Sequence, residues 1–155
     1  MPVDILSGMA AMFSDATQVA MVAKLVLAAL LGGVIGLERE KQLRPAGLRT
    51  HMLVTMGACI FTMLSLVAFA GTPAQGYMAA TIVMGIGFVG AGTIVHEKGK
   101  TFGLTTAASL WLTASIGVAV ATEYFLLAIV ASVIGVLVLS MKPVEDSIHG
   151  SPAKK

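Results

Sequence analysis

Five long apolar stretches dominate the sequence, and short polar segments separate them. The stretches cover residues 18–37, 51–70, 77–95, 102–121 and 124–141. A helix needs about 20 predominantly apolar residues to cross the hydrocarbon core of a bilayer, and each stretch is close to that length. The pattern therefore predicts an all-α integral membrane protein, built as a bundle of about five transmembrane helices.

Two segments lie outside this pattern. Residues 1–17 mix apolar residues with Pro2, Asp4 and other polar positions, and we expect a helix at the membrane surface or a loose N-terminal arm. Residues 142–155 carry two prolines and mixed charges, and we expect a cytoplasmic tail. The transmembrane domain is expected over residues 18–141, which leaves no room for a second folded domain of usual size.

The composition supports a membrane protein. Apolar residues make up 57% of the chain and charged residues 12%, whereas soluble domains carry roughly 25% charged residues. The mean hydropathy is +0.91. A soluble domain would have too little polar sequence to cover its surface, and disorder requires low hydrophobicity with high net charge. Both classes are therefore disfavoured.

The basic residues fall almost entirely on one side of the predicted bundle. Of ten lysines and arginines, four lie in the loop after the first stretch, two after the third and three in the tail; only Lys24 falls on the other side. The positive-inside rule then places the N-terminus outside and the C-terminus in the cytoplasm. Because these charges sit in short loops, the net charge of +2 does not indicate a nucleic-acid partner.

Small residues recur at helical spacing within the stretches, which is how helices approach closely in lipid. The pairs and stripes are Gly32 and Gly36, Gly87 and Ala91, Gly85 and Gly92, Ser109 with Thr113 and Gly117, and Ala131 with Gly135. Packing within a single bundle is the simpler interpretation. The alternative is that one stripe faces a partner protein or another copy of the chain.

Sequence motifs for catalysis, cofactors or metal ions are missing. The letters of Gly85-x-Gly87-x-x-Gly90 match the dinucleotide-binding fingerprint, but they lie inside an apolar stretch, with no acidic residue about 20 positions later. His96-Glu97 lacks the second histidine of a zinc-protease motif. The histidines and the single cysteine lack ligand spacing. We therefore expect no enzyme activity, no cofactor and no metal site.

Charged residues cluster where the first stretch ends and the second begins. The two groups are Glu38, Arg39 and Glu40, and then Arg49, Thr50 and His51. A carboxylate near a helix C-terminus is disfavoured by the helix dipole, so we expect Glu38 to have a cationic partner, with Arg49 the candidate. The alternative is a solvated ion network that only orients the protein. On the other side, Lys24 and Glu123 are either paired or simply interfacial.

The fourth stretch has a polar side. Its hydroxyl residues are Thr105, Thr106, Ser109, Thr113 and Ser115. Such hydroxyls either bond to carbonyls of their own helix or line a path for a solute. Trp111 falls near the middle of the stretch rather than at its end, so we expect its indole N–H to find a partner inside the bundle.

Four blocks of sequence resemble the MgtC/SapB family. They are GLERE at 36–40, PAGLRTHMLV at 45–54, GIGFVGAG at 85–92 and GLTTAA at 103–108, the last followed by Trp111. The blocks occur in order with matching gaps over about residues 24–141, so the resemblance is more specific than any single glycine pattern. The positions that match the family signature are Glu38, Arg39, Gly47, Arg49, Thr50, Gly85, Gly87, Gly90, Gly92, Gly103, Thr105, Thr106 and Trp111.

The resemblance implies a multi-pass protein of the bacterial inner membrane. It implies a link to growth at low magnesium and, in pathogens, to survival inside macrophages. It also implies regulation of other membrane proteins, with the proton-translocating ATP synthase or a transporter as the expected partner. Longer members carry a soluble cytoplasmic domain after the last crossing. This chain has only the residues 142–155 there, which resembles the short, SapB-like members.

Three hypotheses follow for the function. The leading one is a non-enzymatic regulator whose small-residue helix faces contact a partner within the bilayer. The second is a transporter or channel for magnesium or another cation, with Glu38 at the inner mouth and Thr105, Thr106 and Ser109 along the path. It is weakened because magnesium sites use carboxylates, and the middle of the predicted bundle has none. The third, an intramembrane enzyme, lacks a recognisable catalytic constellation.

Overall fold

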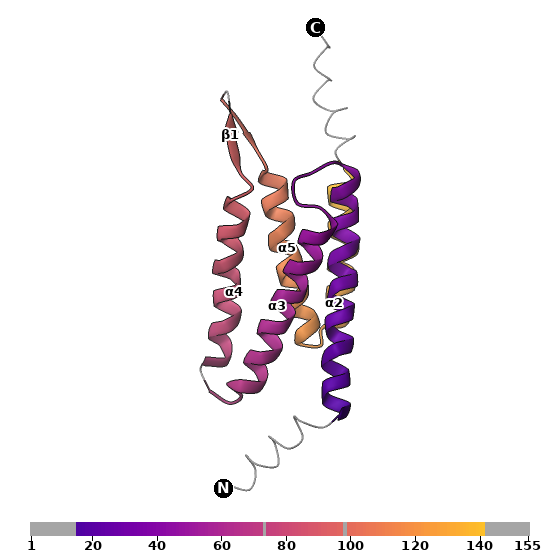
Figure 1. The fold of residues 1–155 in the computed structure, drawn as a ribbon, viewed down its shortest axis with the longest axis vertical. Coiled ribbons are helices and arrows are strands. Elements are labelled where there is room, and N and C mark those ends of the chain that lie inside the picture. Colours follow the sequence, from indigo (N-terminus) through magenta and orange to yellow (C-terminus); the bar gives the residue numbers. More distant parts are fainter. Residues whose placement is uncertain (1–14, 73, 98, 142–155) are drawn as a thin grey trace, which may run out of the picture.

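The structure, a computed structural model, describes residues 15–72, 74–97 and 99–141. These residues form five helices and one short hairpin, and the helices run side by side as a bundle (Figure 1). The elements are α2 (Asp15–Lys41), α3 (Leu48–Ala68), α4 (Ala74–Ala91), β1 (Val95–Glu97), β2 (Lys100–Phe102), α5 (Leu104–Ala121) and α6 (Phe125–Leu139). Most of the predicted N-terminal arm and the whole predicted tail lie outside the described residues.

The helices follow the predicted apolar stretches. Three of them, α2, α3 and α5, are long and apolar enough to span a bilayer. The apolar part of α4, Gly76–Ala91, and helix α6 are shorter. The expectation of an all-α membrane protein is confirmed, and the hairpin is a small addition to it.

The third apolar stretch ends earlier than predicted. Helix α4 stops at Ala91, and Val95 lies in strand β1, which pairs antiparallel with β2. The segment predicted as a loop is therefore a hairpin. Gly99 has a φ of 76°, a left-handed conformation that tight hairpin turns require and that glycine adopts without steric cost.

Small residues let α2, α3 and α5 pack closely. A Cβ atom added at Gly36 of α2 would lie 2.7 Å from the Cα atom of Leu48, and one added at Gly117 of α5 would collide with the carbonyl oxygen of Thr55. Close backbone approach of this kind is the main source of helix association in lipid. For α2 and α5, the prediction that small-residue stripes pack inside the bundle is confirmed.

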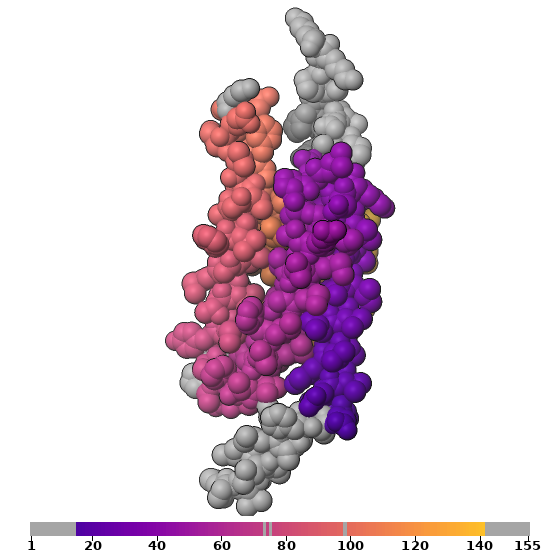
Figure 2. All heavy atoms as spheres, in the orientation of Figure 1, coloured from indigo at the N-terminus to yellow at the C-terminus, as the bar shows by residue number. Residues whose placement is uncertain are grey.

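Helix α4 is attached differently. Only Ile86 and Gly90 are buried among its described residues, and nothing lies within 4 Å of a Cβ atom added at Gly85 or Gly87. Figure 2 shows a hollow between the upper parts of α3 and α4, and the two helices meet below it. Gly85 and Gly87 are therefore not used for packing within this chain.

The bundle has two chemically different ends. One end, called the basic end here, holds the α2–α3 loop and the β1–β2 hairpin (Figure 1), with Arg39, Arg44 and Arg49. At the opposite end, Nζ of Lys24 on α2 lies 2.8 Å from Oε1 of Glu123 in the α5–α6 turn. Of the two alternatives for these residues, the structure confirms the ion pair.

Candidate functional site

A cluster of buried polar side chains lies toward the basic end, where α2, α3 and α5 meet. Its members are at most 3% exposed: Arg39, His51, Thr55, Thr106, Ser109 and Thr113. Polar groups removed from water are costly unless they find hydrogen-bond partners inside the protein. We therefore take these six residues, called the buried polar cluster, as the candidate functional site.

His51 joins α3 to α5 at the centre of the cluster. Its ring Nδ1 lies 2.9 Å from the carbonyl oxygen of Gly47, and its Nε2 lies 3.1 Å from Oγ of Ser109. A carbonyl oxygen can only accept, so Nδ1 carries the proton and donates it to Gly47. In the neutral ring, Nε2 is then an acceptor that faces the Ser109 hydroxyl.

The Ser109 hydroxyl has two acceptors within reach. Its Oγ lies 2.8 Å from the carbonyl oxygen of Thr106 as well as 3.1 Å from Nε2 of His51. One hydroxyl proton can serve only one of them fully. The Ser109 hydroxyl is therefore placed between an acceptor of its own helix and the ring of His51 on α3.

Two other hydroxyls of α5 bond to their own helix. Thr113 donates to the carbonyl of Ser109 at 2.7 Å, and Ser115 donates to that of Leu112 at 2.7 Å. Thr55 of α3 does the same toward His51 at 2.8 Å. The simpler of the two interpretations of the polar side of α5 is thus confirmed for these residues.

Glu40 fixes the entry into α3. Its Oε2 accepts a hydrogen bond of 2.9 Å from the backbone N–H of Leu48, one of the unpaired donors at a helix N-terminus, where a negative charge is also favourable. A Cβ atom at Gly47 would collide with this carboxylate. The signature glycine at this position therefore makes room for the Glu40 side chain.

The predicted pairing of Glu38 with Arg49 is wrong. Oε1 of Glu38 accepts from Nε2 of Gln42, which also donates to the carbonyl oxygen of Leu139 at 3.1 Å. Arg49 is exposed, and no ion pair joins it to Glu38 within the described residues. Gln42 lies one helical turn after Glu38, so it is nearer than a side chain across the loop.

Trp111 also departs from expectation. Its side chain is 50% exposed and lines a shallow groove of about 140 Å³ between α4 and α5, beside Ile82 and Ser115. It does not point into the bundle because it lies two positions from both Ser109 and Thr113, and residues two apart face different sides of a helix. The expected indole partner inside the bundle is therefore wrong.

The remaining signature positions lie on α3, on and just after α4, and at the start of α5. Gly90 packs on Ala107, whose Cβ lies 3.5 Å from the position of an added Cβ. Gly103 begins α5 with a φ of 88°, and an added Cβ there would collide with the carbonyl of Thr93. Gly85 and Gly87 are exposed. Thr50 is half-buried, while Gly92 and Thr105 are exposed.

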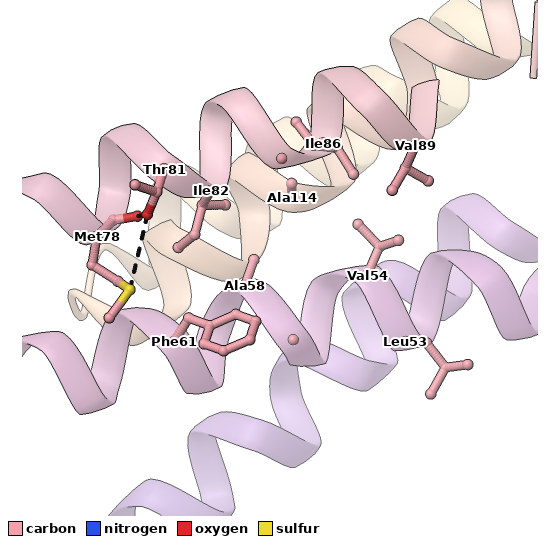
Figure 3. A pocket seen from close by; sticks show the side chains of 12 residues that line it. Leu53, Val54, Ala58, Phe61, Met78, Thr81, Ile82, Ile86, Val89 and Ala114 are labelled. Atoms are coloured by element: carbon pink, nitrogen blue, oxygen red, sulfur yellow. Dashed lines mark hydrogen bonds between the residues drawn. The ribbon is translucent and has the colours of Figure 1, made fainter. Parts of the chain in front are cut away.

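An apolar groove of about 360 Å³ separates α3 from α4. Figure 3 shows Val54, Ala58 and Phe61 of α3 facing Ile82 and Ile86 of α4 across it. The hydroxyl of Thr81 does not add a free polar group, because it donates to the carbonyl of Met78 at 2.8 Å. The groove is open to the surroundings and offers apolar contact rather than polar recognition.

Sequence reasoning did not select His51 as a site residue. It lies directly after Arg49 and Thr50 in the second signature block, and that position was the available signal. Its partner Ser109 lies 58 residues away, a separation that no local spacing rule detects. Glu38, Arg39, Gly47, Thr50 and Thr106 lie toward the basic end, whereas Gly85, Gly87 and Trp111 lie away from the buried polar cluster.

Apolar helices packed through glycines, with a buried polar cluster toward one end, define a helical membrane protein. Comparison of sequences gives the family. The family model described as MgtC family matches residues 25–147, and the chain belongs to the MgtC family. The expected MgtC/SapB resemblance is thereby confirmed.

Three curated relatives are informative. The candidate magnesium transporter YhiD of Escherichia coli K12 is 40% identical over 125 residues, covering 76% of this chain and 58% of YhiD. Protein MgtC of Salmonella typhimurium LT2 is 46% identical over 110 residues, 71% of this chain and 47% of MgtC. A Haemophilus influenzae protein is 36% identical over 141 residues, 81% and 57% of the two chains. The chain spans about half the length of these relatives, and no solved structure matches it significantly.

Proposed function

We propose that this chain is a non-enzymatic regulator in the bacterial inner membrane, which acts by contact with other membrane proteins during adaptation to low magnesium. All five helices would cross the membrane, with the N-terminus outside and the basic end in the cytoplasm. The link to magnesium is supported by membership of the MgtC family and by the name of the relative YhiD. An ATP synthase or a transporter is the kind of partner that the resemblance suggests, and a link to intracellular survival belongs to the same proposal.

The proposal of a regulatory contact rests on the exposed face of α4. Met84 is 70% and Phe88 is 85% exposed, and Gly87 lies beside them with free space around it. A helix that presents a glycine among large apolar side chains allows another helix to approach its backbone closely. Gly36 of α2 and Gly117 of α5 are already covered by α3, whereas Gly85 and Gly87 leave a contact face of α4 unused.

A second candidate, transport of magnesium or another cation, is favoured by the description of YhiD as a candidate magnesium transporter. The described residues lack a group of three or more histidine, cysteine or acidic side chains that could hold a metal ion. Magnesium is bound through oxygen ligands and usually one or two carboxylates. Glu38 and Glu40 are already engaged by Gln42 and Leu48. The regulator is therefore the better supported function.

Co-purification tests the regulator. Membranes are crosslinked and the tagged chain is isolated, as wild type, Gly87→Leu and Ala20→Leu. Ala20 is an exposed small residue of α2, so its replacement adds nearly as much bulk on a different helix. A membrane protein that is recovered with wild type and Ala20→Leu, and lost with Gly87→Leu, supports the proposal. Equal recovery with all three variants contradicts it.

Flux measurements test the transporter. The purified protein is placed in vesicles, and magnesium and proton uptake are compared with empty vesicles and with Glu38→Gln. Uptake above empty vesicles that falls in Glu38→Gln would replace the regulator with the transporter. Uptake equal to that of empty vesicles, with protein shown to be folded, would leave the contact mechanism as the better account.

A further inference from the structure

Two arginines at the basic end form no ion pair with a carboxylate of residues 15–72, 74–97 and 99–141. Arg39, in the last turn of α2, is 2% exposed, and Arg44 lies in the α2–α3 loop and is half-buried. The Nε atoms of both side chains are buried without a hydrogen-bond partner. An arginine stays charged at any physiological pH, so this positive charge cannot be removed by losing a proton.

The loop brings these arginines together. The backbone N–H of Arg44 donates to the carbonyl oxygen of Arg39 at 3.1 Å, which folds the loop back onto the end of α2. Both side chains carry a positive charge. Two like charges are therefore held near each other in a partly dry environment, where repulsion is stronger than in water.

The nearby acidic side chains are engaged elsewhere. Glu40 accepts from the backbone of Leu48, and Glu38 accepts from Gln42. Neither forms an ion pair with Arg39 or Arg44 among the described residues. A buried charge without a partner is costly. Within the part of the chain that the structure describes, the two guanidinium groups therefore lack a paired counter-charge.

We propose that Arg39 and Arg44 form a binding site for a phosphate group. The planar guanidinium presents N–H donors in a fork that matches phosphate oxygens, and such charge-assisted hydrogen bonds are strong. The site lies at the end of the bundle, where lipid headgroups meet the protein, and basic pockets at this level are suited to anionic headgroups. The phosphate comes either from such a lipid or from free phosphate in solution. This site does not depend on the proposed regulatory contact of α4.

Native mass spectrometry of the detergent-solubilised chain tests the lipid source. The protein is mixed with phosphatidylglycerol or with phosphatidylcholine, and the lipid-bound fractions are compared. In parallel, its melting temperature is measured with and without inorganic phosphate at about 150 mM salt, which screens exposed charges. Arg44→Gln removes one of the two guanidinium groups of the site, and Arg39→Lys replaces the other by an ammonium group. Arg49→Gln is the control, because it removes an exposed charge from the same end of the bundle.

We expect wild type and Arg49→Gln to bind the lipid or phosphate probe equally well. Arg44→Gln should weaken binding about tenfold, as expected when a charge-assisted pair is lost, and Arg39→Lys should weaken it in the same direction. Preference for phosphatidylglycerol assigns the lipid source, whereas stabilisation by inorganic phosphate without lipid preference assigns free phosphate. The proposal is overturned if neither probe binds wild type, or if Arg49→Gln loses as much as Arg44→Gln. If Arg39→Lys does not fold, Arg44→Gln alone decides.

Discussion

The ring of His51 on α3 and the hydroxyl of Ser109 on α5 lie 3.1 Å apart in a fully buried position. The contact joins two helices at the level where α2 also packs, and Nδ1 of the same ring is held by Gly47 at 2.9 Å. The imidazole is thus fixed at both nitrogens. This contact is the most specific polar link between helices in the buried polar cluster.

Replacement of Ser109 by alanine should destabilise the bundle. The change leaves Nε2 of His51 buried without its partner, and an unsatisfied buried polar group costs about 1–3 kcal/mol. The free energy of unfolding, measured by denaturant titration in detergent, should fall by that amount.

Ser115→Ala is the matched control for this prediction. It removes a hydroxyl from the same helix, but Ser115 is exposed and bonds only to its own helix at 2.7 Å. Its effect should stay within about 0.5 kcal/mol. Equal losses for Ser109→Ala and Ser115→Ala would mean that the contact with His51 does not stabilise the fold.

Gly36→Ala should be destabilising because of overpacking. The added Cβ would lie 2.7 Å from the Cα atom of Leu48 and 3.0 Å from its carbonyl oxygen, and backbone atoms cannot move aside as a flexible side chain can. We expect a loss of about 1–3 kcal/mol, measured as before. Gly57→Ala on α3 is the control, since nothing lies within 4 Å of its added Cβ. Alanine favours a helix over glycine, so Gly57→Ala should be neutral or slightly stabilising.

The ion pair between Lys24 and Glu123 should make stability depend on acidic pH. The hydrogen bond from Lys24, and then its charge, lower the pKa of the Glu123 carboxyl group. A carboxylate with a lowered pKa in the folded state contributes stability above the unfolded pKa of about 4.3, and the contribution is lost as the pH falls through the folded pKa. Wild type should therefore melt slightly above Glu123→Gln at pH 7, and the difference should disappear at sufficiently acidic pH.

The double variant gives the control for the ion pair. When Lys24 is already replaced by glutamine, Glu123→Gln should have no further effect on the melting temperature, because the pair no longer exists. Since Glu123 is exposed, the whole effect should be small and should decrease with added salt. A pH dependence that persists in the Lys24→Gln background would assign it to another group.

The helices could be predicted from the sequence because the bilayer fixes their length and composition. Packing of Gly32 and Gly36 inside the bundle could be predicted too, but not that α3 is the helix they contact. The pairing of side chains was harder. Glu38 was assigned to Arg49 across a loop, yet Gln42 on the same helix was nearer.

Contacts between distant helices could not be derived from spacing. Ser109 and His51 meet only because α3 and α5 start at the same end of the bundle, a fact of topology. The orientation of Trp111 depends on the rotation of α5, which the buried Thr106, Ser109 and Thr113 determine. The hairpin was missed because strands of three residues are too short to show a period of two.

The orientation in the membrane can be tested with cysteine labelling. The native chain has one cysteine, Cys59, which is buried. It should stay unlabelled by a maleimide that does not cross membranes. A cysteine introduced at Thr72, in the α3–α4 turn, should react from outside in intact spheroplasts. One introduced at Lys100, in the hairpin of the basic end, should react only after the membrane is permeabilised. Both positions are exposed.

This pair of variants separates the orientation from the number of crossings. If all five helices cross with the basic end inside, as the distribution of lysine and arginine predicts, the two cysteines must label from opposite sides. Labelling of Lys100→Cys from outside and protection of Thr72→Cys would reverse the orientation but keep the bundle. Labelling of both from the same side would mean that α4 with the hairpin does not cross, which would remove α4 as a contact face within the bilayer. The measurement therefore bears on the proposed regulatory contact as directly as on the fold.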